Sequence, residues 1–516
     1  RITCHFLLRK EKLPSTSVQE RLVSYRKYCY SAMPPNVLKT DLLHSSSSSL
    51  NGNALPTDLE DVWVCPASEK SLRTANPIRA IVDPIVSKSI KSGAERGDGK
   101  DQISLALGDP TVFGNLPPCP AAIEAITETL KMGGAMATGY VNACGTPEAR
   151  AAIAESHGAG ATADNVIVAS GCSGALELAL TALLDADSIL LVPSPGFPLY
   201  SVIAKSHGAK VEYYDLLPDS GWECDLVQMD QLITRLNIID GHNRSMQEST
   251  CGSRSPTQVV RGIVVNNPGN PTGSNYSAHH LRNILKLAHK HHIPIVSDEI
   301  YGDIVFDPNC CFSPMAEISA RMGKHVPVIT ASGLGKQYLV PGWRVGWVIF
   351  HDNHHGSLKE VEAGAKRLAQ VTLGASHLVQ CAIPAVLQPK DIMGMLEWKK
   401  GLTNTLKHQA LFLCGRLTES CHGLTAFCPQ GAMYALVKID VSQFDKNVIY
   451  DDMSFMKHLL EEENVFVLPG RAFGMIPSLK QPCYVFRVVY CAPQEILEQA
   501  VIRIANFCQL HATTKS

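Results

Sequence analysis

Residues 262–273 read GIVVNNPGNPTG, and residues 293–302 read IPIVSDEIYG. Each stretch begins with a short apolar run and ends in polar or turn-forming residues, as expected of a buried strand that stops at a loop. Between them, residues 278–290 have the apolar spacing of a helix. A strand, a helix and another strand in this order predict a parallel sheet in which the helix crosses over one face.

The same alternation extends in both directions along the chain. Strand patterns followed by helical patterns occur at Val166–Ala169 with Ala175–Leu184 and at Ile189–Val192 with Tyr200–His207, and a further strand pattern occurs at Val328–Thr330. We therefore predict an α/β fold with a mostly parallel sheet flanked by helices.

After about Lys366 the pattern changes to long helices and a short meander. The strands of the meander are expected at Ala432–Val437, Val465–Leu468 and Tyr484–Val489. This change predicts a second, smaller α+β domain.

The composition excludes several classes of function. The chain has 516 residues, of which 45% are hydrophobic, enough to bury a large core in two or more domains. The 46 Lys and Arg against 48 Asp and Glu give a net charge of -2, which offers no overall positive field to nucleic acid or to a membrane. The 17 cysteines lack the spacing of zinc ligands or of a disulfide framework, so we expect no metal and a reducing compartment, the cytoplasm. No stretch of roughly 18 or more uncharged apolar residues occurs, so we expect no membrane span.

The first 32 residues are rich in Lys and Arg, with only Glu11 and Glu20 opposing them, so a mitochondrial leader is the alternative to a cytoplasmic location. We favour Met33 as the true start. A serine tract follows at Ser45–Ser49, and its polarity predicts a flexible extension over residues 1–72.

Polar side chains follow four of the predicted strands, at the point where each strand ends. They lie in SGCSG (170–174), in NNPGNPTG (266–273), in SDEIYG (297–302) and at Lys336. Ligands of an open parallel sheet bind at the carboxyl ends of its strands. We therefore expect these residues to converge on one crevice.

Lys336 and Arg344 lie on either side of a Pro-Gly turn in GKQYLVPGWR, so the chain can fold back and bring both cations to one ligand. A lysine amine forms an imine with an aldehyde, and the arginine fork suits a phosphate dianion. Pyridoxal phosphate carries both groups. The alternative is two solvated surface cations.

Asp298 ends an apolar strand, where a carboxylate is costly without a cationic partner. A protonated pyridine nitrogen would be such a partner and would let the ring withdraw electrons from the substrate Cα; a helix N-cap is the alternative. Tyr301 and Asn270 are candidate donors to the cofactor's phenolate oxygen. A core aromatic residue and a turn residue are the plainer interpretations of these two.

Three further positions have the residue types of a ligand site. Gly171, Cys172 and Ser173 would offer backbone N–H groups and a hydroxyl to a phosphate at a helix N-terminus, although Gly-Ser turns before helices are common. Phe197 is a candidate for stacking on the pyridine ring, or else a core residue. Arg487, inside the apolar run YVFRVVY, needs an anion, which is either the substrate α-carboxylate or a structural partner.

Together these segments resemble the fold-type I, class I pyridoxal-phosphate-dependent aminotransferases, and more specifically those that act on tyrosine, over about residues 73–510. The matching blocks occur in the family's order. They are ANPIRAIVD, LGDPTVFGNLPP, SGCSGAL, PGFPLY, LLPDSGWECDL, VVNNPGNPTG, SDEIYGDIVF, LVPGWRVGW, PQGAMYAL and FRVV.

The resemblance implies catalytic and substrate-binding roles. Lys336 would be the Schiff-base lysine and the base that moves the proton from Cα, and Asp298 would pair with the pyridine nitrogen. Tyr301 and Asn270 would be the phenolate donors. Asn270 would also contact the substrate, whose carboxylate Arg487 would clamp.

The resemblance also implies how the phosphate and ring are held. Arg344, Ser173 and the backbone of Gly171 and Cys172 would bind the phosphate. Phe197 would stack on the ring, and Gly108 would lie beside the substrate. Tyr140, in ATGYVNACG, matches the tyrosine that reaches the phosphate of the neighbouring subunit, which implies a homodimer.

The expected domain organisation follows from the same resemblance. Residues 73–118 would form an N-terminal arm and part of the small domain, and residues 119–366 the large cofactor-binding domain. Residues 241–257 are polar and would be a surface insertion in it. Residues 367–516 would complete the small domain.

The implied reaction transfers the amino group of an aromatic L-amino acid, with tyrosine expected, to 2-oxoglutarate, giving 4-hydroxyphenylpyruvate and glutamate. Three segments depart from the family: SGLGK (332–336), NPGNPTG (267–273) and the long stretch 468–483. Since the last precedes Arg487 and would border the side-chain pocket, Phe, Trp, Met or Ala remain alternative donors. A C–S lyase on the same cofactor and a non-catalytic binding protein are two further hypotheses.

Overall fold

The computed structural model describes residues 66–92, 100–247, 259–323, 326–352, 356–475 and 483–513. The basic leader, Met33 and the serine tract lie outside the described residues, as do parts of the expected insertion and of the stretch 468–483. The N-terminal residues that are described include helix α2 (Glu69–Arg73) within the predicted extension.

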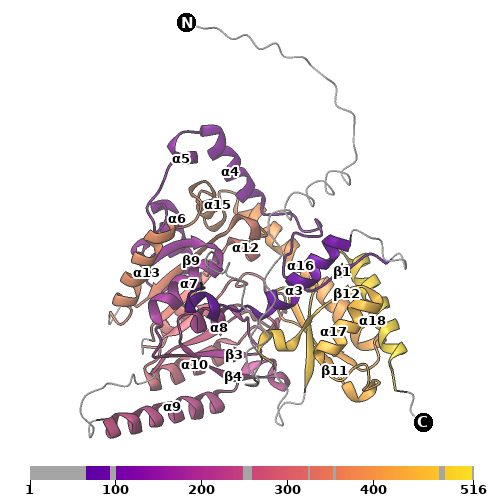
Figure 1. Ribbon diagram of the computed structural model, residues 1–516. Helices are drawn as coiled ribbons and strands as arrows, with labels where there is room; N and C mark the ends of the chain where they lie inside the picture. Colours follow the sequence, from indigo (N-terminus) through magenta and orange to yellow (C-terminus); the bar gives the residue numbers. More distant parts are fainter. Residues whose placement is uncertain are drawn as a thin grey trace, which may run out of the picture. The chain divides into compact units, whose positions relative to one another are not determined.

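A central sheet of eight strands organises the larger part of the fold (Figure 1). In spatial order its strands are β2 (Val166–Ser170), β9 (Val345–His351), β8 (Val328–Gly333), β7 (Ile295–Asp298), β6 (Val259–Asn266), β3 (Ser188–Ser194), β4 (Lys210–Leu217) and β5 (Glu223–Cys224). The pairs among β8, β7, β6, β3 and β4 are all parallel, which confirms the predicted α/β fold. Strand β9 is antiparallel to both of its neighbours, and β5 is antiparallel to β4.

Helices cover both faces of this sheet because its strands alternate between two apolar faces. In β6, Val264 packs in one core cluster, whereas Ile263 and Val265 pack in the other. The cluster around Val264 takes in helices α7 (Gly171–Leu183), α8 (Leu199–Ser206) and α13 (Lys359–Thr372). The opposite cluster takes in α9 (Leu226–Gln247), α10 (Ala278–His291) and α11 (Met315–Arg321). The helix expected at Ala175–Leu184 begins at Gly171, whose φ of +72° turns the chain directly from strand to helix.

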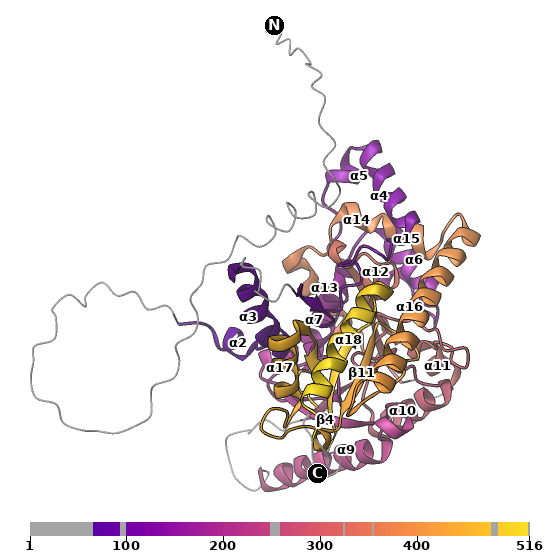
Figure 2. The same cartoon turned by 90° about the vertical axis from the view of Figure 1, so that its right-hand side faces the viewer.

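A smaller α+β part contains an antiparallel sheet with the order β10 (Leu424–Ala426), β11 (Tyr434–Ile439), β14 (Tyr484–Val489) and β13 (Leu468–Pro469). Helices α16 (Ile392–Ser420), α17 (Asp452–Glu463) and α18 (Gln494–Leu510) pack with it, and α16 and α18 lie side by side (Figure 2). The predicted middle strand of the meander is split into β12 (Val465–Phe466) and β13.

A segment from the N-terminal side joins this smaller part. Strand β1 (Ile103–Ser104) pairs in parallel with β12, and Ile78 and Val82 of helix α3 (Pro77–Ser92) belong to the same core cluster as β11 and β14. The remaining helices are α4 (Pro120–Met132), α5 (Ala135–Thr138), α6 (Pro147–His157), α12 (Leu334–Gln337), α14 (His377–Gln380) and α15 (Ala382–Leu387). In the described part of the chain, none of the helices combines the length and the apolar composition that crossing a membrane requires.

The residue after β7, Glu299, carries a buried carboxylate. Its side chain is 3% exposed, and its Oε1 atom accepts hydrogen bonds from Ser297 Oγ at 2.8 Å and from the Met315 amide at 3.0 Å. Burial raises the pKa of Glu299 from 4.5 to about 7, against the lowering effect of these hydrogen bonds. The folded chain therefore holds a proton on Glu299 in a pH range where the unfolded chain has released it.

We predict that Glu299→Gln stabilises the protein at about pH 8 but not at about pH 5. Since the folded state binds the extra proton, the wild type loses stability as the pH rises through this range, by on the order of 3 kcal/mol. Glutamine accepts the same two hydrogen bonds and has no charge to bury.

The measurement is the thermal midpoint of wild type and variant at both pH values. Glu498→Gln, at an exposed position on α18, is the matched control and should change neither midpoint. A difference between Glu299→Gln and wild type that is the same at both pH values would contradict a titrating buried carboxylate.

Candidate active site

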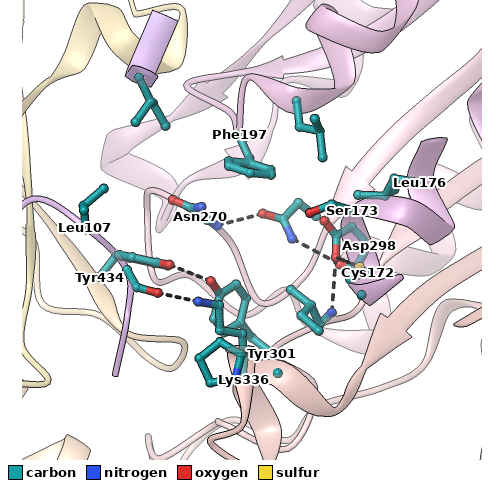
Figure 3. Close-up of a pocket in the computed structure, with 18 of the residues that line it drawn as sticks. Leu107, Cys172, Ser173, Leu176, Phe197, Asn270, Asp298, Tyr301, Lys336 and Tyr434 are labelled. Carbon is teal, nitrogen blue, oxygen red and sulfur yellow. Dashed lines mark hydrogen bonds between the residues drawn. The ribbon is translucent and has the colours of Figure 1, made fainter. Parts of the chain in front are cut away.

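A cavity of about 340 Å³ lies where the carboxyl ends of the central strands meet α3 and β14. Nearly all of the residues singled out in the sequence line it: Gly108, Gly171, Cys172, Ser173, Phe197, Asn270, Asp298, Tyr301, Lys336, Arg344 and Arg487. Tyr140 is the exception, since it follows α5 and is 93% exposed. Figure 3 shows Phe197 on one side of the cavity and Lys336 with Tyr301 on the other.

The strand register explains why distant segments meet here. Asn266, at the end of β6, is paired with Asp298 at the end of β7, and Asp298 is paired with Ala331 of β8. The Asn266 side chain also donates to the Asp298 carbonyl at 3.1 Å. The NPGNPTG loop therefore begins beside Asp298. Lys336 comes shortly after the end of β8, the strand on the other side of Asp298.

The Asp298 carboxylate is buried, with 3% of the residue exposed. Burial raises its pKa, although hydrogen bonds from the Tyr200 hydroxyl at 2.7 Å, the Ile300 amide at 3.2 Å and the Cys172 thiol at 3.6 Å act in the opposite direction. No Lys or Arg of the described residues forms an ion pair with it. A cationic group of a ligand would supply the missing partner.

Lys336 lies on the short helix α12, directly after β8. Its amine donates a hydrogen bond to the carbonyl oxygen of Gly108, which anchors the amine at the cavity. A Cβ atom at position 108 would lie 2.0 Å from the Tyr434 hydroxyl, so only glycine permits this close approach.

Two phenols and an amide face the cavity beside the lysine. The hydroxyls of Tyr301 and Tyr434 are 2.6 Å apart, so one of them donates to the other and the second hydroxyl hydrogen is available to a ligand. Asn270 Oδ1 accepts a hydrogen bond from Arg487 at 2.9 Å. This contact orients the Asn270 amide and leaves its nitrogen as the group that can donate to a ligand. Tyr301 and Asn270 are therefore both able to donate to an anionic oxygen.

Arg487 is 3% exposed and has no acidic partner among the described residues. One guanidinium nitrogen donates to Asn270 and another to the Ala106 carbonyl, while Nε has no hydrogen-bond partner. The guanidinium lies over the rings of Tyr434 and Phe473, at 4.3 and 4.7 Å from their centroids. Burial lowers the pKa of Arg487, which is the signature of a cation that lacks an anion.

An anion cradle forms where β2 passes into α7. The first turn of α7 presents free backbone N–H groups at Gly171, Cys172 and Ser173. Arg344 donates to the Ser170 carbonyl at 3.3 Å, and a Cβ on Gly171 would lie 2.6 Å from its guanidinium. The N-terminus of α7 and the Arg344 guanidinium can therefore contact the same anion. Gly171 makes this possible because it has no side chain to push the guanidinium away.

These groups fit pyridoxal phosphate. The cradle suits the phosphate dianion, the Lys336 amine suits the aldehyde, and the Asp298 carboxylate suits a protonated pyridine nitrogen. The donors Tyr301 and Asn270 suit the phenolate oxygen, and the Phe197 ring is available to stack. The fit rests on the unpaired buried charges and on the close approaches that glycine permits.

Several residues of the site were not expected from the sequence. Tyr434, which lines the cavity, and Tyr200, which lies behind Asp298, belong to the quoted blocks PQGAMYAL and PGFPLY but gave no signal beyond an apolar surrounding. Asn76 and Arg79 of ANPIRAIVD and the exposed Leu107 also line the cavity. Asn76 lies directly before α3, where its side chain accepts hydrogen bonds from the Ile78 and Arg79 amides; an Asn followed by Pro is a helix-start signal that could have placed this helix end in the site.

Comparisons with known proteins agree with this geometry. Residues 100–504 match the family model of class I and II aminotransferases. A tyrosine aminotransferase of Mus musculus is 36% identical over 480 residues, covering 92% of this chain and 94% of the mouse protein, and one of Dictyostelium discoideum is 36% identical over 453 residues, covering 87% and 97%.

Among solved structures, a tyrosine aminotransferase from Leishmania infantum superimposes with a TM-score of 0.72 at 29% identity, covering 88% of this chain and all of that one. The family match spans most of the chain and includes every strand of the central sheet. The chain therefore belongs to the class I and II aminotransferases, the pyridoxal-phosphate-dependent family that its sequence resembles.

Proposed function

We propose that the chain transfers the amino group of an aromatic L-amino acid, with tyrosine as the main donor, to 2-oxoglutarate, giving 4-hydroxyphenylpyruvate and glutamate. The observation that carries this proposal is a single cavity with a buried carboxylate, a buried guanidinium and a lysine amine, in which neither charge has a counter-ion among the described residues. The tyrosine aminotransferases among its relatives support the choice of donor.

We assign the cofactor contacts to residues of the large sheet and its helices. The backbone of Gly171 and Cys172, the Ser173 hydroxyl and Arg344 would hold the phosphate, and Asp298 would hold the pyridine nitrogen. Tyr200 fixes Asp298 by its 2.7 Å hydrogen bond. When bound, the cofactor supplies an electron-withdrawing ring that stabilises negative charge at the substrate Cα.

The substrate would be oriented by its carboxylate. Arg487 offers Nε and the unused hydrogens of its fork, and a carboxylate there completes the ion pair that the buried guanidinium lacks. Because the arginine lies against two aromatic rings, its plane is held in one orientation. The Cα–H bond of the substrate is thereby presented to one side of the cavity.

Lys336 is the amine that would take this proton. It is the only lysine that lines the described cavity, and Gly108 holds its Nζ by a hydrogen bond. An amine at this position accepts the proton from Cα and returns it to a neighbouring carbon, so one group serves both halves of the reaction.

The donor side chain would occupy the part of the cavity near α3. Leu107 and Ile78 provide an apolar surface, and Asn76 and Arg79 provide polar groups. An aromatic ring that carries a hydroxyl has both kinds of surface, which is why we place tyrosine ahead of Phe, Met or Ala.

We also propose a homodimer. Tyr140 is 93% exposed, and large apolar side chains of the adjoining α4 and α5 are exposed as well, among them Met132 at 73% and Met136 at 57%. Apolar residues in such a group are typical of a surface that a second subunit covers. The cytoplasmic location stays a prediction.

A panel of amino donors tests the proposed activity. With 2-oxoglutarate as acceptor, we expect the highest kcat/KM for tyrosine and lower values for Phe, Trp, Met and Ala, measured by detecting the keto acid. Lys336→Ala should lose turnover by more than about 1000-fold and lose the absorbance band of the imine between the lysine and the cofactor. Lys457→Ala, at an exposed position on α17, is the control.

Two results would contradict the proposal. Steady-state transamination retained by Lys336→Ala would remove the lysine from its role. Release of ammonia and pyruvate from a cysteine conjugate, without need of a keto acid, would identify a lyase instead.

Arg487→Lys tests the carboxylate clamp. A lysine keeps the charge but has no fork, so we expect kcat/KM for tyrosine to fall by roughly 10- to 100-fold, as a lost charge-assisted hydrogen bond implies. The absorbance of the bound cofactor should not change. Arg367→Lys, at an exposed position on α13, should behave as wild type, and an unaltered kcat/KM in Arg487→Lys would refute the clamp.

A further inference from the structure

Two free cysteines meet outside the active site. Cys414 lies on α16 and is 4% exposed, whereas Cys428 is exposed in the loop after β10. The Cys414 thiol is 3.9 Å from the carbonyl oxygen of Phe427, the residue that precedes Cys428, so the two cysteines are neighbours. The described residues contain no group of acidic, His and Cys side chains suited to a metal, so a metal site does not explain the pair.

A second contact holds the loop that carries Cys428 against α16. Thr418 lies one helical turn after Cys414 and therefore on the same face of α16. Its hydroxyl oxygen accepts a hydrogen bond from the Ala426 amide at 3.0 Å. The chain from Ala426 to Cys428 thus runs along the face of α16 that carries Cys414.

The environments of the two thiols differ in a way that suits an attacking thiolate and a second, resolving thiol. The neighbouring Cys414 thiol lowers the pKa of Cys428 to about 7, although burial and the charge of Asp307 act in the opposite direction. The pKa of Cys414 is raised by the neighbouring Cys428 and by burial. Cys428 is therefore the thiol of the pair that ionises more readily, and it is exposed; the thiolate is the form that peroxides oxidise.

We propose that Cys428 and Cys414 are a reversible oxidation site that forms a disulfide in response to a peroxide. The Cys428 thiolate attacks one peroxide oxygen, the O–O bond breaks, and protonation of the leaving oxygen gives water and a sulfenic acid on Cys428. Cys414 then attacks the Cys428 sulfur, the S–S bond forms, and the departing hydroxide leaves as water with the proton of Cys414. A dithiol reductant reverses the step by exchange.

This site is connected to the active site by the segment that starts at Cys428. The amides of Gln430 and Gly431 donate to the Gly273 carbonyl at 2.9 and 3.0 Å, and the Gln430 carbonyl accepts from the Phe306 amide at 3.0 Å. The same segment ends at Tyr434, whose hydroxyl meets Tyr301 in the cavity. It therefore ties the small sheet to the NPGNPTG loop and positions a lining residue.

Oxidation would move the start of this segment. A disulfide requires an S–S distance of about 2.05 Å, much shorter than any contact between two unbonded sulfur atoms, so Cys428 must shift toward α16. We expect the shift to disturb Tyr434 and to lower turnover several-fold. The effect on turnover rests on the proposed function, whereas the disulfide itself does not.

The experiment treats the cofactor-loaded full chain with hydrogen peroxide, blocks the remaining thiols by alkylation and maps the peptides by mass spectrometry. We expect a peptide that links Cys414 to Cys428, formed before the exposed Cys311 is oxidised, together with a loss of turnover that dithiothreitol restores. Cys311→Ser should behave as wild type. Cys428→Ser and Cys414→Ser should form no such link and should keep their turnover at the same dose.

Two results would overturn the inference. One is recovery of both cysteines as alkylated thiols at a dose that oxidises Cys311, and the other is a link from Cys428 to Cys310. A Cys414–Cys428 link without loss of turnover would establish the oxidation site and refute its connection to Tyr434. An inactive protein that still forms the link would count against the proposed function alone.

Discussion

Two buried charges of opposite sign, the carboxylate of Asp298 and the guanidinium of Arg487, face one cavity without a counter-ion among the described residues. Burying an unpaired ion costs several kcal/mol, so a fold keeps such groups only where ligands complete them. In the proposed function, a cofactor with a cationic ring nitrogen and a substrate with a carboxylate would supply the two missing charges. The proposed chemistry at Lys336 would depend on this pairing, because it would set where both ligands lie.

The surrounding fold holds these groups by a few close approaches. Gly108 leaves room for the Tyr434 hydroxyl, and its carbonyl oxygen accepts a hydrogen bond from the Lys336 amine. Gly171 leaves room for the Arg344 guanidinium. A Cβ on Gly346 would lie 2.3 Å from the Gly171 backbone, so β9 also presses against the first turn of α7. The active site is therefore a contact between segments far apart in the sequence, and small shifts of either part reach it.

The sequence allowed the strand-end residues to be predicted, since Asp298 and Lys336 follow apolar runs that only a buried strand explains. Tyr200 and Tyr434 could not be found in this way, because their roles come from contacts with Asp298 and Tyr301 that no local pattern records. Strand β9 was missed, although its apolar run Val345–Phe350 is typical of a buried strand; only its antiparallel direction could not have been predicted from a local pattern. The role implied for Tyr140 concerns a second subunit and stays a prediction.

The most direct test of the pairing is the chemical shift of the pyridine nitrogen in isotopically labelled pyridoxal phosphate bound to the enzyme near neutral pH. A buried carboxylate at position 298 predicts a protonated nitrogen in the wild type and an unprotonated one in Asp298→Asn, which has the same shape without the charge. The same shift in both proteins would contradict the account.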